Sequence, residues 1–116
     1  MLQKLALIRC AVADMDAAII FYRDILGLSL KSQSPAWSEF DLGHTSLGLH
    51  RGEPQALSPR AGWTLSFEVS DVKASKELLE AAGVTIVGDF HEIPGGVVLD
   101  IIDPDGTPVD LVQQTG

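Results

Sequence analysis

Apolar and polar residues alternate with a period of two at the start of both halves of the chain. The stretches are LALIRCAV (5–12) and TLSFEV (64–69), and this period predicts strands that are buried on one face. An aspartate, Asp14 or Asp71, follows each strand at the position expected for a helix N-cap. Aligning Val69 on Val12 gives an offset of 57 residues (69 − 12), which also aligns these two aspartates. The chain is therefore predicted to contain a repeated strand–helix unit.

The two predicted helices show apolar residues at three- and four-residue spacing. Gly27 and Gly83 are placed to end them. The expected buried face of the first helix consists of Ala18, Phe21, Tyr22, Ile25 and Leu26, and that of the second of Val72, Leu78, Leu79 and Ala82.

Three further strands are predicted in each half, over 29–32, 37–42, 45–51 and then 84–90, 96–102, 108–113. The segment 51–62 contains two prolines and two glycines and is interpreted as a linker. Asp103-Pro104-Asp105-Gly106 suits a type I turn. Each half is thus a βαβββ module.

Three stretches resemble the vicinal-oxygen-chelate superfamily, which includes lactoylglutathione lyases, bleomycin-resistance proteins and extradiol dioxygenases. They are VADMDAAIIFYRDILGL (12–28), VSDVKASKELLEAAGV (69–84) and DPDGTPVDLVQ (103–113). The resemblance implies an α+β fold in one domain, residues 1–116, with modules 1–51 and 62–116. It also implies a curved mixed sheet that forms a cup, with helices on the convex side. Such a fold does not by itself select one activity.

Alternation along each strand predicts which side chains face the helices and which face the cup. Cys10 and Val12, for example, belong to the helix side, as do Phe40, Leu47 and Leu49. Asp110 stands between Val109 and Leu111 and should face the cup. The candidate ligand-binding residues are Arg9, Trp37, Glu39, His50, Thr64, Glu68 and Asp110.

By resemblance, the metal ligands of the superfamily's enzymes correspond to Leu7, Gly48, Thr64 and Asp110. Only Asp110 is a good ligand, whereas catalytic divalent sites need about three protein ligands. We therefore expect no metal cofactor. The alternative is a divalent metal held in a non-standard way by Glu39, His50, Glu68 and Asp110.

Each candidate also has a simpler interpretation. Asp110 is either a ligand-binding carboxylate or base, or a solvated acid, and His50 is either an acid/base group or a surface histidine. Arg9 either pairs with Glu68 or Asp110 or clamps a ligand carboxylate. Trp37 either stacks on a planar ligand or lies at the rim of a subunit interface.

Other chemically active residues are interpreted as structural. His91 and Glu92 are expected in a loop, and as neighbours they would point apart. His44 is expected in a turn, and Cys10 as a small buried hydrophobe.

Charge and composition exclude some partners. The chain has 16 acidic and 8 basic residues, a formal charge of −8, and no cluster of Lys and Arg, so neither nucleic acid nor an anionic membrane is an expected partner. No apolar run approaches the ~18 residues of a membrane span. The opening MLQKLALIRC lacks the apolar stretch of a secretory signal, and we expect a cytoplasmic protein.

These observations lead to one functional hypothesis and two alternatives. We expect a cytoplasmic homodimer that binds a small organic molecule in the cup without a metal, and the net charge of −8 favours cationic ligands. The enzyme alternative is a metal-dependent lyase, isomerase or dioxygenase. A third possibility is an interaction module with a vestigial cup.

Overall fold

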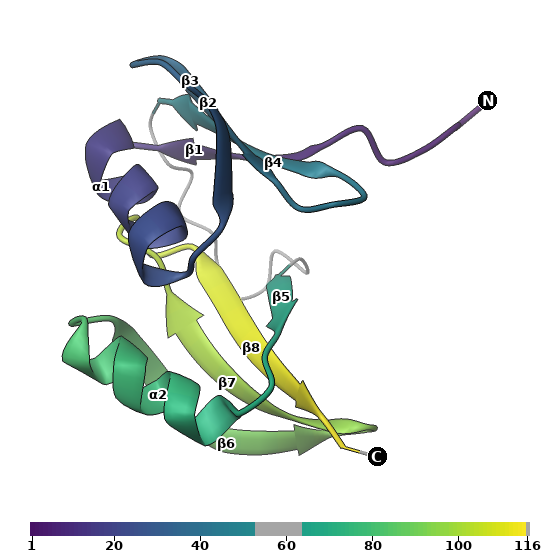
Figure 1. The fold of residues 1–116 in the computed structure, drawn as a ribbon, viewed down its shortest axis with the longest axis vertical. Helices are drawn as coiled ribbons and strands as arrows, with labels where there is room; N and C mark the ends of the chain where they lie inside the picture. Colours follow the sequence, from purple (N-terminus) through teal and green to yellow (C-terminus); the bar gives the residue numbers. More distant parts are fainter. Residues whose placement is uncertain (53–63, 116) are drawn as a thin grey trace. The chain divides into compact units, whose positions relative to one another are not determined.

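The computed structural model of the protein describes residues 1–52 and 64–115, which form two compact units, 1–55 (unit 1) and 56–116 (unit 2) (Figure 1). The predicted linker over 51–62 lies largely outside the described residues. The elements of unit 1 are β1 (Ile8–Val12), α1 (Met15–Ile19), η1 (Ile20–Ile25), β2 (Ser29–Gln33), β3 (Trp37–Asp41) and β4 (Ser46–Arg51). Those of unit 2 are β5 (Leu65–Glu68), α2 (Val72–Ala81), β6 (Thr85–Ile93), β7 (Gly96–Ile102) and β8 (Pro108–Gln114).

Each unit contains one four-stranded mixed sheet. The strand orders are β1-β4-β3-β2 and β5-β8-β7-β6. In both sheets the first strand pairs in parallel with the fourth, and the remaining neighbours are antiparallel. The two predicted βαβββ modules and the α+β class are confirmed. The common cup depends on how the units are placed and stays a prediction.

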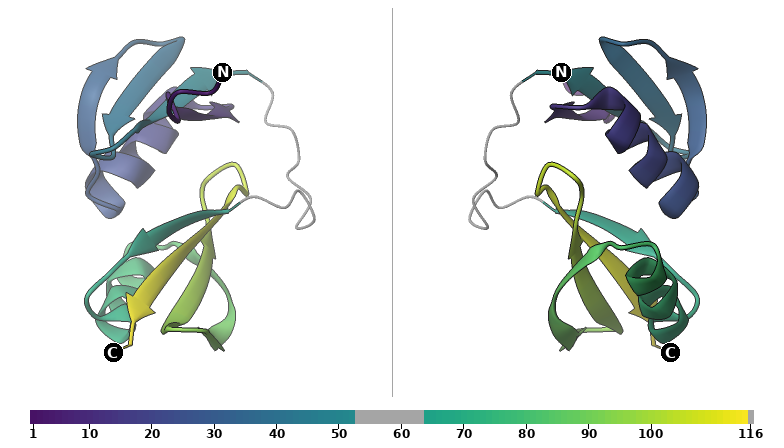
Figure 2. Two further views of the ribbon diagram at one scale, coloured as in Figure 1. Left: turned by 90° about the vertical axis from the view of Figure 1, so that its right-hand side faces the viewer. Right: turned by 90° about the vertical axis from the view of Figure 1, so that its left-hand side faces the viewer.

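The helix of unit 1 packs on one face of its sheet (Figure 2). The side chains of Phe40, Leu47 and Leu49 on that face are fully buried. From the helix, Phe21 and Tyr22 are buried as predicted, and the Tyr22 ring lies 6.0 Å from the Phe40 ring. The apolar residues that alternate along the strands and those spaced along the helix thus pack together in one core. The helix changes to π geometry from Ile20 to Ile25, which the spacing does not predict.

In unit 2, α2 covers the corresponding face, where Leu99, Ile101, Val109 and Leu111 are buried. Val72 and Leu79 complete this core. Leu78 is 74% exposed and Ala82 is exposed as well, so the predicted burial of these two residues is wrong. Leu79 follows Val72 by seven residues, about two turns, and shares its face, whereas Leu78 points about 100° away.

The predicted caps are present in both units. Asp14 accepts a hydrogen bond from the Ala17 N–H, and Asp71 accepts from the N–H groups of Lys73 and Ala74. Gly27 and Gly83 follow the helices with φ of 80° and 78°, a conformation that favours glycine.

The predicted turn at Asp103 closes with a hydrogen bond from the Gly106 N–H to the Asp103 carbonyl. The Asp103 carboxylate is buried and accepts from the N–H groups of Asp105 and Thr107 at 2.9 and 2.8 Å. The turn between β7 and β8 is therefore held by a hydrogen-bonded acid.

One strand extends further than predicted. β6 continues to Ile93, because Glu92 and Ile93 pair with Val97 and Gly96 across a tight turn. His91 therefore lies in a strand, and its predicted loop position is wrong. His44 lies between β3 and β4 as predicted. Among the described residues, no helix is long and apolar enough to span a membrane.

Candidate functional site

Strand register in unit 1 brings four candidate residues onto one face of the sheet. Gly48 pairs with Arg9 on one side and with Glu39 on the other. His50 pairs with Trp37 in the same way. Because paired residues share a face and alternate with the core positions, Arg9, Trp37, Glu39 and His50 lie on the side opposite α1. We call this side the helix-free face of unit 1.

The indole of Trp37 covers Gly48. A Cβ atom built on Gly48 would lie 2.4 Å and 2.5 Å from the Cη2 and Cζ2 atoms of Trp37, closer than real Cβ atoms approach. A side chain on this strand position would project from the helix-free face, and the ring fills that space. Glycine is therefore required at position 48 as long as the ring stays where it is.

Glu39 holds the indole in this position. Its Oε1 atom accepts a hydrogen bond of 3.3 Å from Trp37 Nε1, and its Oε2 atom lies 3.2 Å from Lys31 Nζ. The hydrogen bond from Lys31 is the main cause that holds the pKa of Glu39 below its ordinary value of 4.5, and desolvation opposes it. Weaker contributions from the Trp37 hydrogen bond, the charge of Lys31 and the Ser46 hydrogen bond also lower this pKa. Both carboxylate oxygens of Glu39 are thus engaged.

Arg9 and His50 add polar side chains to the same face as this indole. Arg9 is exposed, and the part of the chain that the structure describes offers it no ion pair within 4.0 Å. His50 is half-buried next to Trp37 in the register. The predicted pairing of Arg9 with Glu68 or Asp110 would join two units and stays a prediction.

In unit 2, Asp110 lies on the face opposite α2, as the alternation predicts. Its neighbours Val109 and Leu111 are buried at 1% and 4% exposure, and Asp110 pairs with Ser66 and Asp100. Its Oδ1 atom is buried and has no hydrogen-bond partner among the described residues. A buried oxygen without a partner costs free energy, so this acid is a candidate for binding a donor group of a ligand.

Two further candidates in unit 2 are exposed. Thr64 precedes β5, and Glu68 is its last residue. The sequence analysis did not identify Asp100 or His91 as residues of this region. In the structure, His91 Nδ1 lies 3.5 Å from Asp100 Oδ2. The alternation of β7 would have placed Asp100 beside Asp110, but His91 could be found only once β6 was known to extend.

The superfamily's metal site does not fit the residues of this chain. Leu7 has no donor atom, and Trp37 occupies the space into which a ligand at Gly48 would project. Within residues 1–52 and 64–115, no three His, Cys, Asp or Glu side chains are grouped as metal ligands. A metal held by Glu39 is further disfavoured because Lys31 and Trp37 already engage both oxygens.

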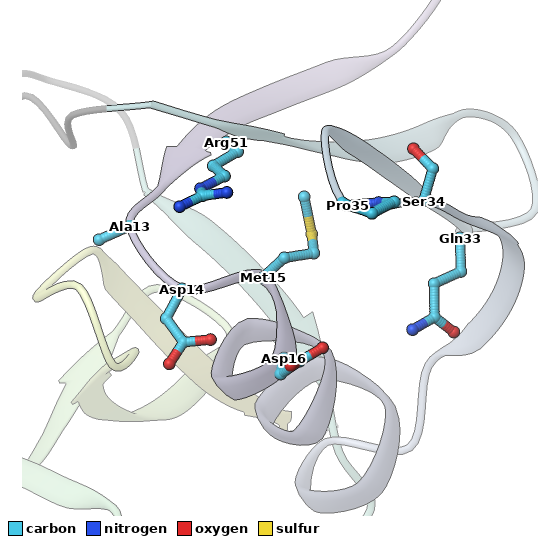
Figure 3. Close-up of a pocket in the computed structure, with 8 residues that line it drawn as sticks. All are labelled: Ala13, Asp14, Met15, Asp16, Gln33, Ser34, Pro35 and Arg51. Atoms are coloured by element: carbon cyan, nitrogen blue, oxygen red, sulfur yellow. The ribbon is translucent and has the colours of Figure 1, made fainter.

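A cleft of about 460 Å³ lies elsewhere in unit 1 (Figure 3). Met15 is its only buried lining residue, and it holds none of the candidate ligand-binding residues. Its lining comes from the segment after β1, the start of α1, the β2–β3 turn and the end of β4: Ala13, Asp14, Met15, Asp16, Gln33, Ser34, Pro35 and Arg51.

Comparison with known proteins identifies the family. A match to the family described as Glyoxalase/Bleomycin resistance protein/Dioxygenase superfamily extends over residues 4–111. The chain belongs to this superfamily. The resemblance found in the sequence is thereby confirmed, although the superfamily contains proteins of several activities.

Individual relatives of this superfamily protein differ in function. The chain is 27% identical over 119 residues to the lactoylglutathione lyase of Haemophilus influenzae, covering 88% of this chain and 86% of the lyase. It is 26% identical to TnmS3, an antibiotic binding protein from Streptomyces sp. CB03234, with 98% of each chain covered and a TM-score of 0.77. A lactoylglutathione lyase from Agrobacterium tumefaciens shares the fold at 22% identity, with a TM-score of 0.75 over 97% of this chain and 95% of that one.

Proposed function

We propose that this superfamily member binds a small organic molecule without a metal ion. The observation that carries the proposal is the position of Trp37, whose indole fills the space above Gly48. A stacking surface thus stands where the superfamily's enzymes hold a metal ligand. The similarity to an antibiotic binding protein supports a binding function.

Unit 2 offers a separate candidate contact for a small molecule, the carboxylate of Asp110. Asp110 Oδ1 has no partner among the described residues, and a hydroxyl or ammonium donor would satisfy it. We infer in addition that the protein is a cytoplasmic homodimer, which light scattering of the purified protein and its localisation in cells would test.

The second candidate function is that of a metal-dependent lyase, which the similarity to a lactoylglutathione lyase favours. Elemental analysis of untagged protein separates the two. We expect less than about 0.1 equivalent of zinc, nickel, iron or manganese, because one carboxylate cannot hold such an ion tightly. About one equivalent per chain, lost in an Asp110→Ala/His50→Ala variant, would replace the binding function with the lyase.

A ligand screen by thermal shift, with and without divalent metals, tests binding directly. A molecule that binds only the folded state raises the apparent stability. We expect hits that do not depend on metal and that are lost in Trp37→Ala. Hits that appear only with metal would contradict the proposal.

A further inference from the structure

We infer that the helix-free face of unit 1 selects a planar ligand that carries a carboxylate, with Arg9 as the residue that binds this group. The inference rests on the proposed function and adds the class of ligand. It follows from which charged side chains of this face are engaged by their neighbours and which are not.

Glu39 is unavailable to neutralise Arg9. The two residues flank Gly48 in the register, one on each neighbouring strand. Both oxygens of Glu39 are engaged, one by Trp37 Nε1 and the other by Lys31 Nζ. The carboxylate and the lysine compensate each other, so the guanidinium of Arg9 has no counter-ion beside it among the described residues. Asp41 also lies on this face, but it pairs with Ser46, two residues along β4 from Gly48, and its Oδ1 atom accepts a hydrogen bond from the Gly43 N–H.

Arg9 stands beside the indole rather than far from it. The ring lies over Gly48, which pairs directly with Arg9, and neighbouring strands are about 4.8 Å apart. A guanidinium binds a carboxylate through two parallel N–H bonds. A carboxylate attached directly to an aromatic ring can reach Arg9 while the ring stacks on Trp37.

This ligand class differs from the one that the whole chain suggests. The net charge of −8 favours the approach of cations over long distances. Contacts at the site act over a few ångströms and decide which group stays bound, since exposed charges beyond about 8–10 Å are screened at ordinary salt. The local guanidinium therefore outweighs the net charge in selecting the bound group.

The test uses three probes: 2-naphthoate and 2-naphthylmethylammonium, which are matched in size, and the smaller, non-planar cyclohexanecarboxylate. Each is titrated at one fixed salt concentration into ¹⁵N-labelled full-length protein, and the Trp37 indole N–H signal is followed by NMR. The chain has two tryptophans, and Trp63→Phe assigns the two signals. We expect 2-naphthoate to shift the Trp37 signal and to bind more tightly than either other probe.

Arg9→Gln should weaken 2-naphthoate about tenfold, the size expected for a charge-assisted hydrogen bond, and leave the ammonium probe unweakened. Arg51→Gln removes the same charge at another exposed position of unit 1 and should change binding less than about twofold if long-range charge is weak. Equal losses in both variants would overturn the role of Arg9.

The outcomes separate the two proposals. If 2-naphthylmethylammonium binds as tightly as 2-naphthoate and shifts Trp37, the anion preference is overturned while small-molecule binding stands. Equal binding of cyclohexanecarboxylate would overturn the requirement for a planar ligand. If no probe shifts Trp37 at millimolar concentration, the planar-carboxylate inference is overturned, and the thermal-shift screen decides the proposed function separately.

Discussion

Gly48 and Asp110 occupy equivalent positions in the two units, yet their surroundings differ. The Trp37 ring covers Gly48, whereas Asp110 has a buried oxygen without a hydrogen-bond partner among the described residues. Each lies on the fourth strand of its unit, and each pairs with a residue of the first strand, Arg9 or Ser66. These partners are related by the offset of 57 residues (66 − 9) found in the sequence. On the other side, Gly48 pairs with Glu39 and Asp110 with Asp100.

In unit 1, a side chain of the same unit fills the space above Gly48. Trp37 covers Gly48 and donates to Glu39, and Lys31 completes the contacts. The residue of unit 2 that corresponds to Trp37 is Val98, since each pairs two positions beyond the central residue of the fourth strand.

Valine is too small to cover the neighbouring strand, and in unit 2 Asp110 keeps a buried oxygen without a partner among the described residues. Unit 1 thus presents an aromatic surface at this position, whereas unit 2 presents an acid. A duplicated fold can diverge in this way because each unit has its own core.

The largest expected effect comes from giving unit 1 the acid of unit 2. Gly48→Asp should lower the free energy of unfolding by about 1–3 kcal/mol, because the new side chain overlaps the Trp37 ring. Urea denaturation measures the change. Adding Trp37→Val, the residue of unit 2, should restore part of the loss.

Gly52→Asp is the matched control for this substitution. Among the described residues, a Cβ atom there meets only the His50 ring, at 3.7 Å and 3.9 Å, so the effect of the substitution should stay within about 0.5 kcal/mol. Equal losses for the two glycines would show that the ring does not restrict position 48.

A second comparison concerns two acids of unit 2. Asp110→Val should raise the free energy of unfolding by about 0.5–2 kcal/mol, because a buried oxygen without a partner is removed. Asp103→Ala should lower it by about 1–2 kcal/mol, because the two N–H groups that it accepts from lose their partner. The Asp110 variant should also lose ligand affinity. A marked loss of stability in Asp110→Val would mean that this acid has a structural role.

The smallest effect is the pH dependence of the Glu39 contact. The pKa of Glu39 is lowered in the folded state, so its contribution to stability is present above the unfolded value and is lost as the pH falls below 4.5 through the folded pKa. Lys31→Met should make this acid-side decrease shallower, measured by denaturation between pH 3 and 6. Lys4→Met, at an exposed position with no ion pair among the described residues, is the control.

Much of the fold and some of the site follow from local chemistry along the chain. Period-two alternation assigns Arg9, Trp37, Glu39 and Asp110 to the helix-free faces, because successive strand residues point to opposite sides. Aspartate caps and glycine stops mark the helices for equally local reasons. The resemblance to the superfamily also places Leu7 and Gly48, whose side chains have no donor atom, at two of the expected metal-ligand positions.

What only the tertiary structure decided is where the side chains on those faces meet. Alternation predicts the face of the sheet on which a side chain lies, but not the direction in which the side chain leans. The contact of the Trp37 ring with Gly48 could therefore not be predicted. The contact of Lys31 with Glu39 depends on a bulge that shifts the register between β2 and β3, and the burial of Asp110 Oδ1 is seen only in the folded structure. Those contacts join residues distant in the chain, and side-chain packing across strands, rather than periodicity, determines them.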